Sequence, residues 1–229
     1  MSGRRPCVAI DGPVAAGKST IARLVARELG YTYIDSGAMY RALAWAAAQE
    51  HVAADSAAEA CALLARTDIH LIPQPHGGNR VEVNGRDVTA EIRTLEIGQL
   101  ASRLSEIPGV REQMVARQQE MARDGGVVME GRDIQTVVLP DAEVKIFLTA
   151  SAEARARRRW LELKQRGAAA DLEQILTGIK ERDERDSNRA HSPLRAAAEA
   201  VRVDTSDLSI EGVVAAVLEV VRGRLAHPG

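Results

Sequence analysis

The chain has 229 residues, a length that fits one large domain, or a domain with an insertion, better than two full domains. Hydrophobic residues make up 45% of it and charged residues 27%, which excludes wholesale disorder, collagen and fibrous coiled coils. The 32 acidic residues nearly balance the 30 lysines and arginines, and the net charge is −2. Because this balance offers no broad positive surface, we expect neither nucleic acid nor a membrane as a partner.

The sequence shows no pattern typical of a membrane span, a signal peptide or a disulfide framework. No apolar run approaches the length of a membrane span, and the N-terminal residues lead into a short strand-like segment instead of a signal-peptide core. Cys7 and Cys61 have neither metal-ligand spacing nor the number needed for a disulfide framework. We therefore expect a soluble protein of the cytoplasm.

Five short apolar runs rich in valine and isoleucine predict buried strands. They cover residues 7–10, 31–34, 127–129, 144–148 and 201–203. Between them lie helical patterns, of which the first runs from Ile21 to Leu29 and ends at Gly30, while Ser209 is placed to cap the last. This alternation predicts an α/β fold with a mostly parallel sheet covered by helices on both faces.

Residues 68–88 interrupt the alternation. An extended segment at 69–72 is followed by a loop and by two short runs joined through Asn84-Gly85, the strongest short hairpin signal. A small antiparallel insertion is therefore expected, followed by helical sequence from about residue 91 to 104 and again from residue 110. Residues 151–189 predict two highly charged helices separated near Gly167, a composition that suits a mobile cover.

One segment matches the pattern G-x-x-x-x-G-K-[ST] between a predicted strand and a predicted helix. It reads Gly12-Pro13-Val14-Ala15-Ala16-Gly17-Lys18-Ser19-Thr20. In such a loop, backbone N–H groups and a helix N-terminus hold phosphate oxygens, Lys18 spans the terminal phosphates and the Ser19 hydroxyl ligates Mg²⁺. The pattern predicts a nucleoside triphosphate and a metal ion, and it leaves the second substrate open.

Polar residues follow two further strands. Asp35-Ser36 and Arg41 come after the second strand, and Glu130-Gly131-Arg132-Asp133 come after the third. Because ligands of an open parallel sheet sit beyond the carboxyl ends of its strands, we expect both groups beside the P-loop. There an acid can hold Mg²⁺ or its water, and Arg132 can reach phosphate.

Two charged helices add more arginines. Arg182, Asp186 and Arg189 are spaced so that they share one helix face, and Arg155 with residues 157–159 forms a second cationic group. Solvated helix faces are the ordinary alternative. A phosphate-bearing acceptor would explain both groups, because transfer from a triphosphate brings several negative charges together. Such an acceptor also needs no strong general base, which favours a nucleoside monophosphate.

Taken together, these residues resemble the bacterial cytidylate (CMP) kinase family. The resemblance runs from about Val8 to the final helix and is carried by several short blocks in order. Besides the P-loop, the blocks include Asp35-Ser36-Gly37, Tyr40-Arg41, Asp87-Val88-Thr89, Ile92-Arg93, Gly131-Arg132-Asp133, and Arg182-Asp183 through Asp186 to Asn188-Arg189. Where the family pattern usually has aspartate and glycine, this chain has Glu130 and Gln135.

The resemblance implies a P-loop kinase core with a five-stranded parallel sheet flanked by helices. This core would comprise residues 1–35, 108–152 and 171–229, with an NMP-binding insertion at 36–107 that holds a small antiparallel sheet and a helical lid at 153–170. The implied reaction is Mg²⁺-assisted in-line transfer of a phosphoryl group from ATP to CMP, to dCMP and, more weakly, to UMP. A lid that closes over both substrates needs no second subunit, so we expect a monomer.

The family's roles carry over residue by residue. The residues expected at the CMP phosphate are Ser36, Arg41, Arg132 and Arg189. Those expected to read cytosine are Ser102, Arg111 and Asp133, and those at the ribose are Arg182 and Asp186. The expected catalytic set is Lys18, Arg132, Arg189 and the lid residues Arg157 and Arg158. Ser19 would ligate Mg²⁺ directly and Glu130 would do so through water.

Two other classes of protein remain as alternatives. A P-loop switch protein would bind GTP and signal without transferring phosphate, but the chain has neither an Asn-Lys-x-Asp tetrapeptide nor an Asp-x-x-Gly motif. A related small-molecule kinase, for shikimate or a deoxynucleoside, would prefer a hydroxyl acceptor over CMP.

Overall fold

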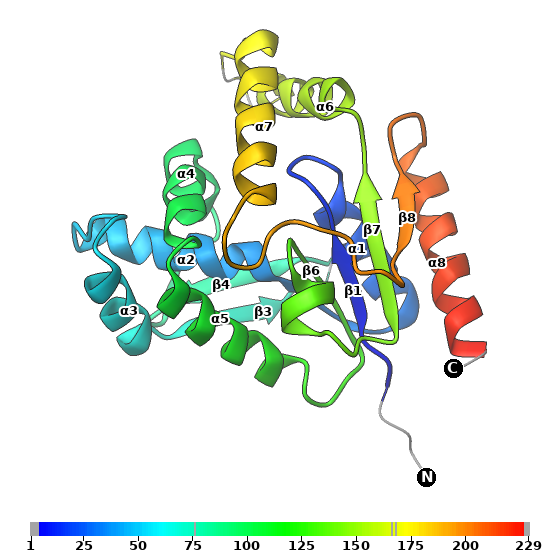
Figure 1. Ribbon diagram of the computed structural model, residues 1–229, viewed down its shortest axis with the longest axis horizontal. Coiled ribbons are helices and arrows are strands. Elements are labelled where there is room, and N and C mark those ends of the chain that lie inside the picture. The colour runs from blue at the N-terminus through cyan, green and yellow to red at the C-terminus, as the bar shows by residue number, and fades with distance from the viewer. Residues whose placement is uncertain (1–4, 76, 166, 168, 227–229) are drawn as a thin grey trace.

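The computed structural model describes residues 5–75, 77–165, 167 and 169–226. Its centre is a parallel sheet of five strands in the order β2-β6-β1-β7-β8 (Figure 1). The strands are β1 (Val8–Asp11), β2 (Thr32–Asp35), β6 (Val127–Gly131), β7 (Val144–Thr149) and β8 (Val201–Asp204). All five predicted strands are thus confirmed, and so is their parallel arrangement.

Helices cover both faces of this sheet. Val8 and Ile10 of β1 pack on one side with α1 (Lys18–Leu29) and α8 (Ile210–Ala226). Ala9, between them in the strand, packs on the other side with Ile134 of the short helical segment η2 (Ile134–Val138). Adjacent residues of β1 therefore face opposite layers, as the pleat of a strand requires. The expected cap of α8 is present, because Ser209 Oγ accepts the N–H of Gly212 at 3.1 Å.

The segment between β2 and β6 has its own apolar core, which includes Leu43, Leu64 and Met114, so Met114 packs with the expected insertion although it lies beyond residue 107. Its elements are α2 (Ser36–Gln49), α3 (Ala57–Arg66), β3 (Ile69–Pro73), β4 (Asn79–Val83), β5 (Arg86–Asp87), η1 (Glu91–Arg93), α4 (Leu95–Leu104) and α5 (Pro108–Met121). Strands β3, β4 and β5 form the expected antiparallel sheet. Asn84 and Gly85 both have positive φ, 50° and 78°, which is the conformation that the hairpin turn demands.

The helical stretch expected at residues 91–104 consists of two elements instead of one. Thr94 between them is extended, and its side chain accepts the N–H of Ile97 at 3.3 Å. Because an N-cap hydroxyl satisfies a donor of the following helix, Thr94 ends the turn η1 and begins α4.

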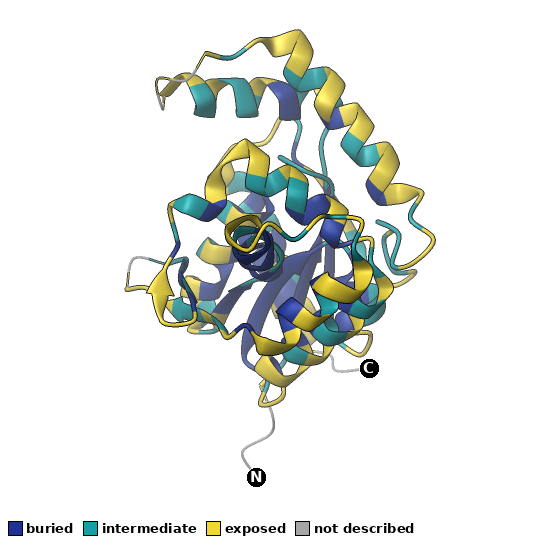
Figure 2. Cartoon of the chain, turned by 90° about the vertical axis from the view of Figure 1, so that its left-hand side faces the viewer, coloured by how far each residue is buried: buried dark blue, intermediate teal, exposed yellow. Residues whose placement is uncertain are grey.

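The two charged helices are α6 (Ala152–Gln165) and α7 (Leu172–Ser187), separated near Gly167 as expected. They pack against each other beyond the carboxyl ends of the strands (Figure 1), and much of their surface is exposed (Figure 2). Trp160 donates to the carbonyl of Ala170 at 3.2 Å and so ties α6 to the connection that precedes α7. In the described ranges, no helix is both long and apolar enough to cross a bilayer.

Candidate active site

The P-loop joins β1 to α1. Gly12 has a φ of 154°, and a Cβ at this position would lie 2.2 Å from the carbonyl oxygen of Leu148, so the approach of β7 requires glycine here. Gly17, the N-cap of α1, has a left-handed φ of 89° and brings no side chain to the helix N-terminus. Lys18 folds back over the loop and donates to the carbonyl of Pro13 at 2.8 Å. The loop thus has the conformation in which N–H groups and an ammonium hold phosphate oxygens.

The Lys18 side chain is buried. Burial, together with the nearby Arg132, lowers the pKa of its ammonium to about 7, against the opposing effect of Glu130 and Asp11. A bound polyphosphate would favour the charged form again.

Asp11 ends β1 immediately before the P-loop and is fully buried. Its carboxylate accepts the N–H groups of Ile134 at 3.1 Å and Gln135 at 2.8 Å. It therefore fixes the turn that carries Arg132 and Asp133 to the strand that carries the P-loop. Burial raises the pKa of Asp11 to about 7. From the sequence, Asp11 was assigned no role at the site, although a carboxylate at the end of an apolar strand was a signal for one.

Glu130 and Ser19 lie together near Lys18. Glu130 accepts the hydroxyl of Tyr33 at 3.0 Å. Burial and the neighbouring Asp35 raise the pKa of Glu130, whereas Lys18 and the nearby Ser19 hydroxyl lower it. A hydroxyl and a carboxylate are oxygen donors of the kind that Mg²⁺ prefers, with phosphate oxygens and waters as its further ligands. The two residues predicted at the metal therefore fit Mg²⁺.

Ser36 and Arg41 lie at the start of α2. Asp35 caps this helix by accepting the N–H of Ala38 at 2.8 Å, and its carboxylate also pairs with Arg41 at 2.9 Å. Ser36 Oγ donates to the carbonyl of Glu130 at 2.6 Å, which brings α2 against the end of β6. The α2 N-terminus, Ser36 and Arg41 are thereby held beside the strand that leads to Arg132.

Four arginines gather next to these residues. Arg182 interacts electrostatically with Arg41, Arg132 and Arg189, and burial together with Arg132 lowers its pKa to about 10. We call these four residues the arginine cluster. Asp186 lies 1% exposed within it and accepts Nε–H of Arg132 at 2.9 Å and Nη2–H of Arg189.

The cluster has more positive charge than its carboxylate balances. Burial alone would raise the pKa of Asp186, but the adjacent Arg132 and Arg189 hold it below its usual range. Among the described residues, the buried Nε atoms of Arg182 and Arg189 have no hydrogen-bond partner. Like charges with unused donors favour a bound anion with several acceptor oxygens.

A second polar group adjoins the cluster. Asp133 and Arg111 form a buried ion pair, and Arg111 also donates to the carbonyl of Ser105 at 3.1 Å. The guanidinium lies 5.8 Å from the ring of Tyr40, whose buried hydroxyl has no partner within the part of the chain that the structure describes. Ser102 Oγ faces α7 and accepts from Arg185 at 3.5 Å. The three residues expected at the base thus lie on α4, on α5 and after β6.

The arginines of α6 differ in what they contact. Arg157 is exposed, and Arg158 donates to Thr205 Oγ1 at 2.9 Å. Arg155 is buried, pairs with Asp183 of α7 at 2.6 Å and donates to the P-loop carbonyl of Val14 at 3.2 Å. Sequence reasoning left Arg155 out of the site, since spacing alone does not distinguish it from its neighbours.

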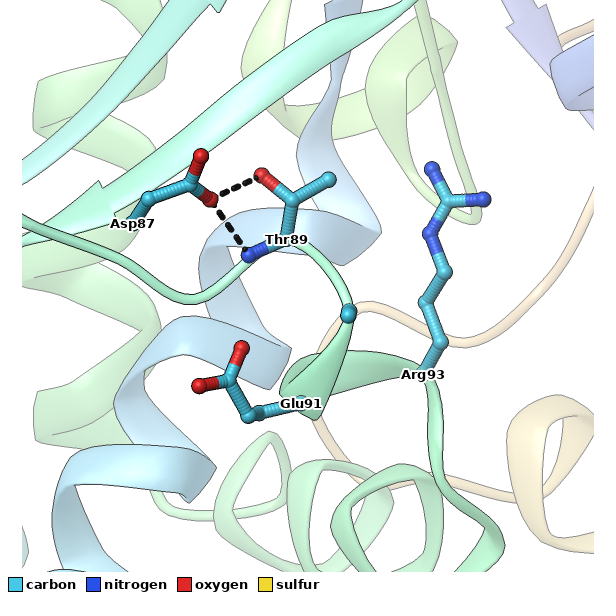
Figure 3. A pocket seen from close by; sticks show the side chains of 5 residues that line it. Asp87, Thr89, Glu91 and Arg93 are labelled. Atoms are coloured by element: carbon cyan, nitrogen blue, oxygen red, sulfur yellow. Dashed lines mark hydrogen bonds between the residues drawn. The ribbon is translucent and has the colours of Figure 1, made fainter.

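An open hollow of about 640 Å³ lies on the insertion (Figure 3). Its lining residues are Asp87, Thr89, Ala90, Glu91 and Arg93. Asp87 accepts both the N–H of Thr89 at 2.9 Å and its hydroxyl at 2.6 Å, so these polar groups satisfy each other. None of the lining residues belongs to the predicted site.

A family model and individual relatives of known name point to the same family. The cytidylate kinase family matches residues 8–223. The chain is 52% identical to the cytidylate kinase of Geobacillus thermodenitrificans, over 97% of this chain and 99% of that one. It is 51% identical to the cytidylate kinase of Bacillus subtilis, over 93% and 95% of the two chains.

Solved structures confirm the fold class at lower similarity. Shikimate kinase from Bacteroides thetaiotaomicron superposes with a TM-score of 0.50 at 15% identity, over 95% of this chain and 98% of that one. This likeness shows a shared P-loop kinase fold and nothing more. The family match over nearly the whole chain, together with relatives about half identical to it, places the protein in the cytidylate kinase family.

Proposed function

We propose that the protein transfers the γ-phosphoryl group of MgATP to CMP and yields ADP and CDP. One observation carries this proposal: the P-loop and the arginine cluster lie at the same end of the sheet and interact through Lys18, Arg132 and Arg182. A donor site and an anion site in such proximity are what transfer between two phosphate groups requires.

On the donor side, the N–H groups of residues 12–20 and the Lys18 ammonium would bind the phosphates of ATP. Ser19, and Glu130 through water, would hold Mg²⁺, which offsets the negative charge that develops on the transferred group. Tyr33 keeps the Glu130 carboxylate oriented by its hydrogen bond.

On the acceptor side, Ser36, Arg41, Arg132 and Arg189 would bind the CMP phosphate. An oxygen of that phosphate forms the new bond to the γ-phosphorus, the bond to the β–γ bridging oxygen breaks, and ADP leaves with the electron pair. The attacking oxygen is already anionic, so positioning and charge neutralisation are the main tasks of the protein.

Specificity for the acceptor nucleoside would come from the residues expected at the base and at the ribose. A carboxylate can accept from the cytosine amino group, and Arg111 and Ser102 can donate to its acceptor atoms. Arg182 and Asp186 would contact the ribose. We expect dCMP to be a substrate as well, and UMP a weaker one because it lacks the amino group that Asp133 would bind.

We further propose that α6 belongs to a lid whose boundaries are near residues 153 and 170, and that Arg157 and Arg158 close on the ATP phosphates. Closure excludes water and limits hydrolysis of ATP. Because such a lid encloses both substrates within one chain, we expect a monomer, and we place its reaction in the cytoplasm.

Product identification tests this proposal. Purified protein, MgATP and CMP should give equal amounts of ADP and CDP by anion-exchange chromatography. ADP accompanied by inorganic phosphate, without CDP, would contradict it.

A further inference from the structure

Asn79 connects the small antiparallel sheet to the main sheet. It is the first residue of β4, and its side chain is turned toward β2, with the residue only 8% exposed. Nδ2–H donates to the carbonyl of Tyr33 at 3.0 Å, and Oδ1 accepts the N–H of Asp35 at 3.4 Å. One amide thus occupies a donor and an acceptor of the same strand.

The two Asn79 hydrogen bonds lie on the outer side of β2. Strand β2 is an edge strand of the five-stranded sheet, so its backbone pairs with β6 on one side and with no strand of that sheet on the other. Tyr33 and Asp35 flank Ile34, so the Asn79 amide bonds β2 in the way that one residue of an added strand would. It does so at the last residue of β2, just before α2 begins.

The acceptor site starts at that residue. The carboxylate of Asp35 caps α2 and pairs with Arg41, and Ser36 follows with its bond to the carbonyl of Glu130. A shift of the β2 end would move the Asp35 carboxylate and the Arg41 guanidinium together.

We propose that Asn79 is a positioning residue for the acceptor phosphate: it holds the end of β2 so that Asp35 keeps Arg41 in place. This inference rests on the proposed function, in which Arg41 binds the CMP phosphate. Asparagine suits the task because one planar group supplies a donor and an acceptor. Aspartate of the same shape lacks the donor toward Tyr33, and alanine lacks both groups.

The test compares steady-state kinetics of Asn79→Ala and wild-type protein. We expect the KM for CMP to rise about tenfold, while the KM for ATP stays within about twofold. If Asn79→Ala does not fold, Asn79→Asp serves instead, with a rise of at least about tenfold, because its carboxylate keeps the acceptor toward Asp35 but sets a negative charge against the carbonyl oxygen of Tyr33. Asn84→Gly is the matched control, because Asn84 lies in the hairpin of the same small sheet and its Oδ1 accepts the N–H of Asp68, away from β2.

A double-mutant cycle with Arg41→Ala separates positioning from general destabilisation. If Asn79 acts through Arg41, the rise in KM for CMP disappears in the Arg41→Ala background. An equal rise in both backgrounds, or an unchanged KM in Asn79→Ala and Asn79→Asp, would overturn the inference. Wild-type protein without CMP-dependent ADP release would instead overturn the proposed function, and the inference with it.

Discussion

Arg132, which follows β6, donates its Nε–H to the carboxylate of Asp186 on α7 at 2.9 Å. This bond joins the turn after β6 to α7, one of the two charged helices. Asp186 also pairs with Arg189, so a single buried carboxylate holds two of the four guanidiniums in the arginine cluster. Asp35 pairs with a third, Arg41, and a bound anion would offset the repulsion that remains among the four guanidiniums.

Removal of the Asp186 carboxylate should destabilise the protein, because the guanidiniums of the arginine cluster then repel one another more strongly. In Asp186→Asn we expect a Tm lower by about 5 to 10 °C, because a buried charge pair loses one partner. Sulfate should restore more stability to the variant than to wild type, since an added anion replaces the missing charge. Thermal unfolding with and without sulfate measures both effects. An equal response of the two proteins to sulfate would count against an anion site.

Lys18→Met should abolish transfer while preserving the fold. In the proposed function the Lys18 ammonium binds the phosphates of ATP, so we expect kcat to fall by at least about a thousandfold. The Tm should not fall, because the variant no longer buries an ammonium whose pKa burial lowers.

Lys145→Met is the matched control for this variant. Lys145 is also buried, but it pairs with Glu199 and donates to the carbonyl of Pro140. We expect this variant to lose stability and to keep most of its activity. Turnover near the wild-type level in Lys18→Met would refute the assigned role of the P-loop lysine.

ATP binding should take up a proton at pH 8. In the free protein the pKa of Lys18 is lowered to about 7, so at pH 8 most molecules have a neutral Lys18 amine. Bound phosphates raise that pKa, so the complex holds more protons than the free protein between the two values. The affinity for ATP should accordingly fall as the pH rises above 7. Calorimetry in two buffers of different ionisation enthalpy measures the uptake, and an equal uptake in Lys18→Met would contradict this origin.

Asp133→Ala should relax the choice of acceptor. We expect the preference for CMP over other monophosphates, measured as the ratio of kcat/KM values, to fall by about 10- to 100-fold. The KM for ATP should change much less. Asp87→Ala is a matched control, because Asp87 ends a second Gly-Arg-Asp tripeptide, which lies in the hairpin. Among the described residues, the Asp87 carboxylate accepts hydrogen bonds from Thr89 alone. Unchanged acceptor ratios in Asp133→Ala would rule out its role at the base.

Local features of this fold and the parallel sheet were predictable, whereas individual contacts between distant segments were not. The five strands, the Asn84-Gly85 hairpin and the P-loop follow from apolar periodicity and turn chemistry, which lie within a few residues of sequence. The break at Thr94 was missed because a threonine hydroxyl inside a helical pattern reveals its capping role only once the chain bends there. Asp11, Asn79 and Arg155 act on segments 44 to 141 residues away, so their partners are set by the packing of the sheet.

The most direct test is ADP release from MgATP by the purified protein with one acceptor at a time. The acceptors are CMP, dCMP, UMP, AMP, GMP, shikimate, cytidine and none. We expect rapid release with CMP and dCMP, slower release with UMP and negligible release without an acceptor. Release that ignores every monophosphate, or that follows shikimate or cytidine, would contradict the proposed function and remove the acceptor roles of the arginine cluster.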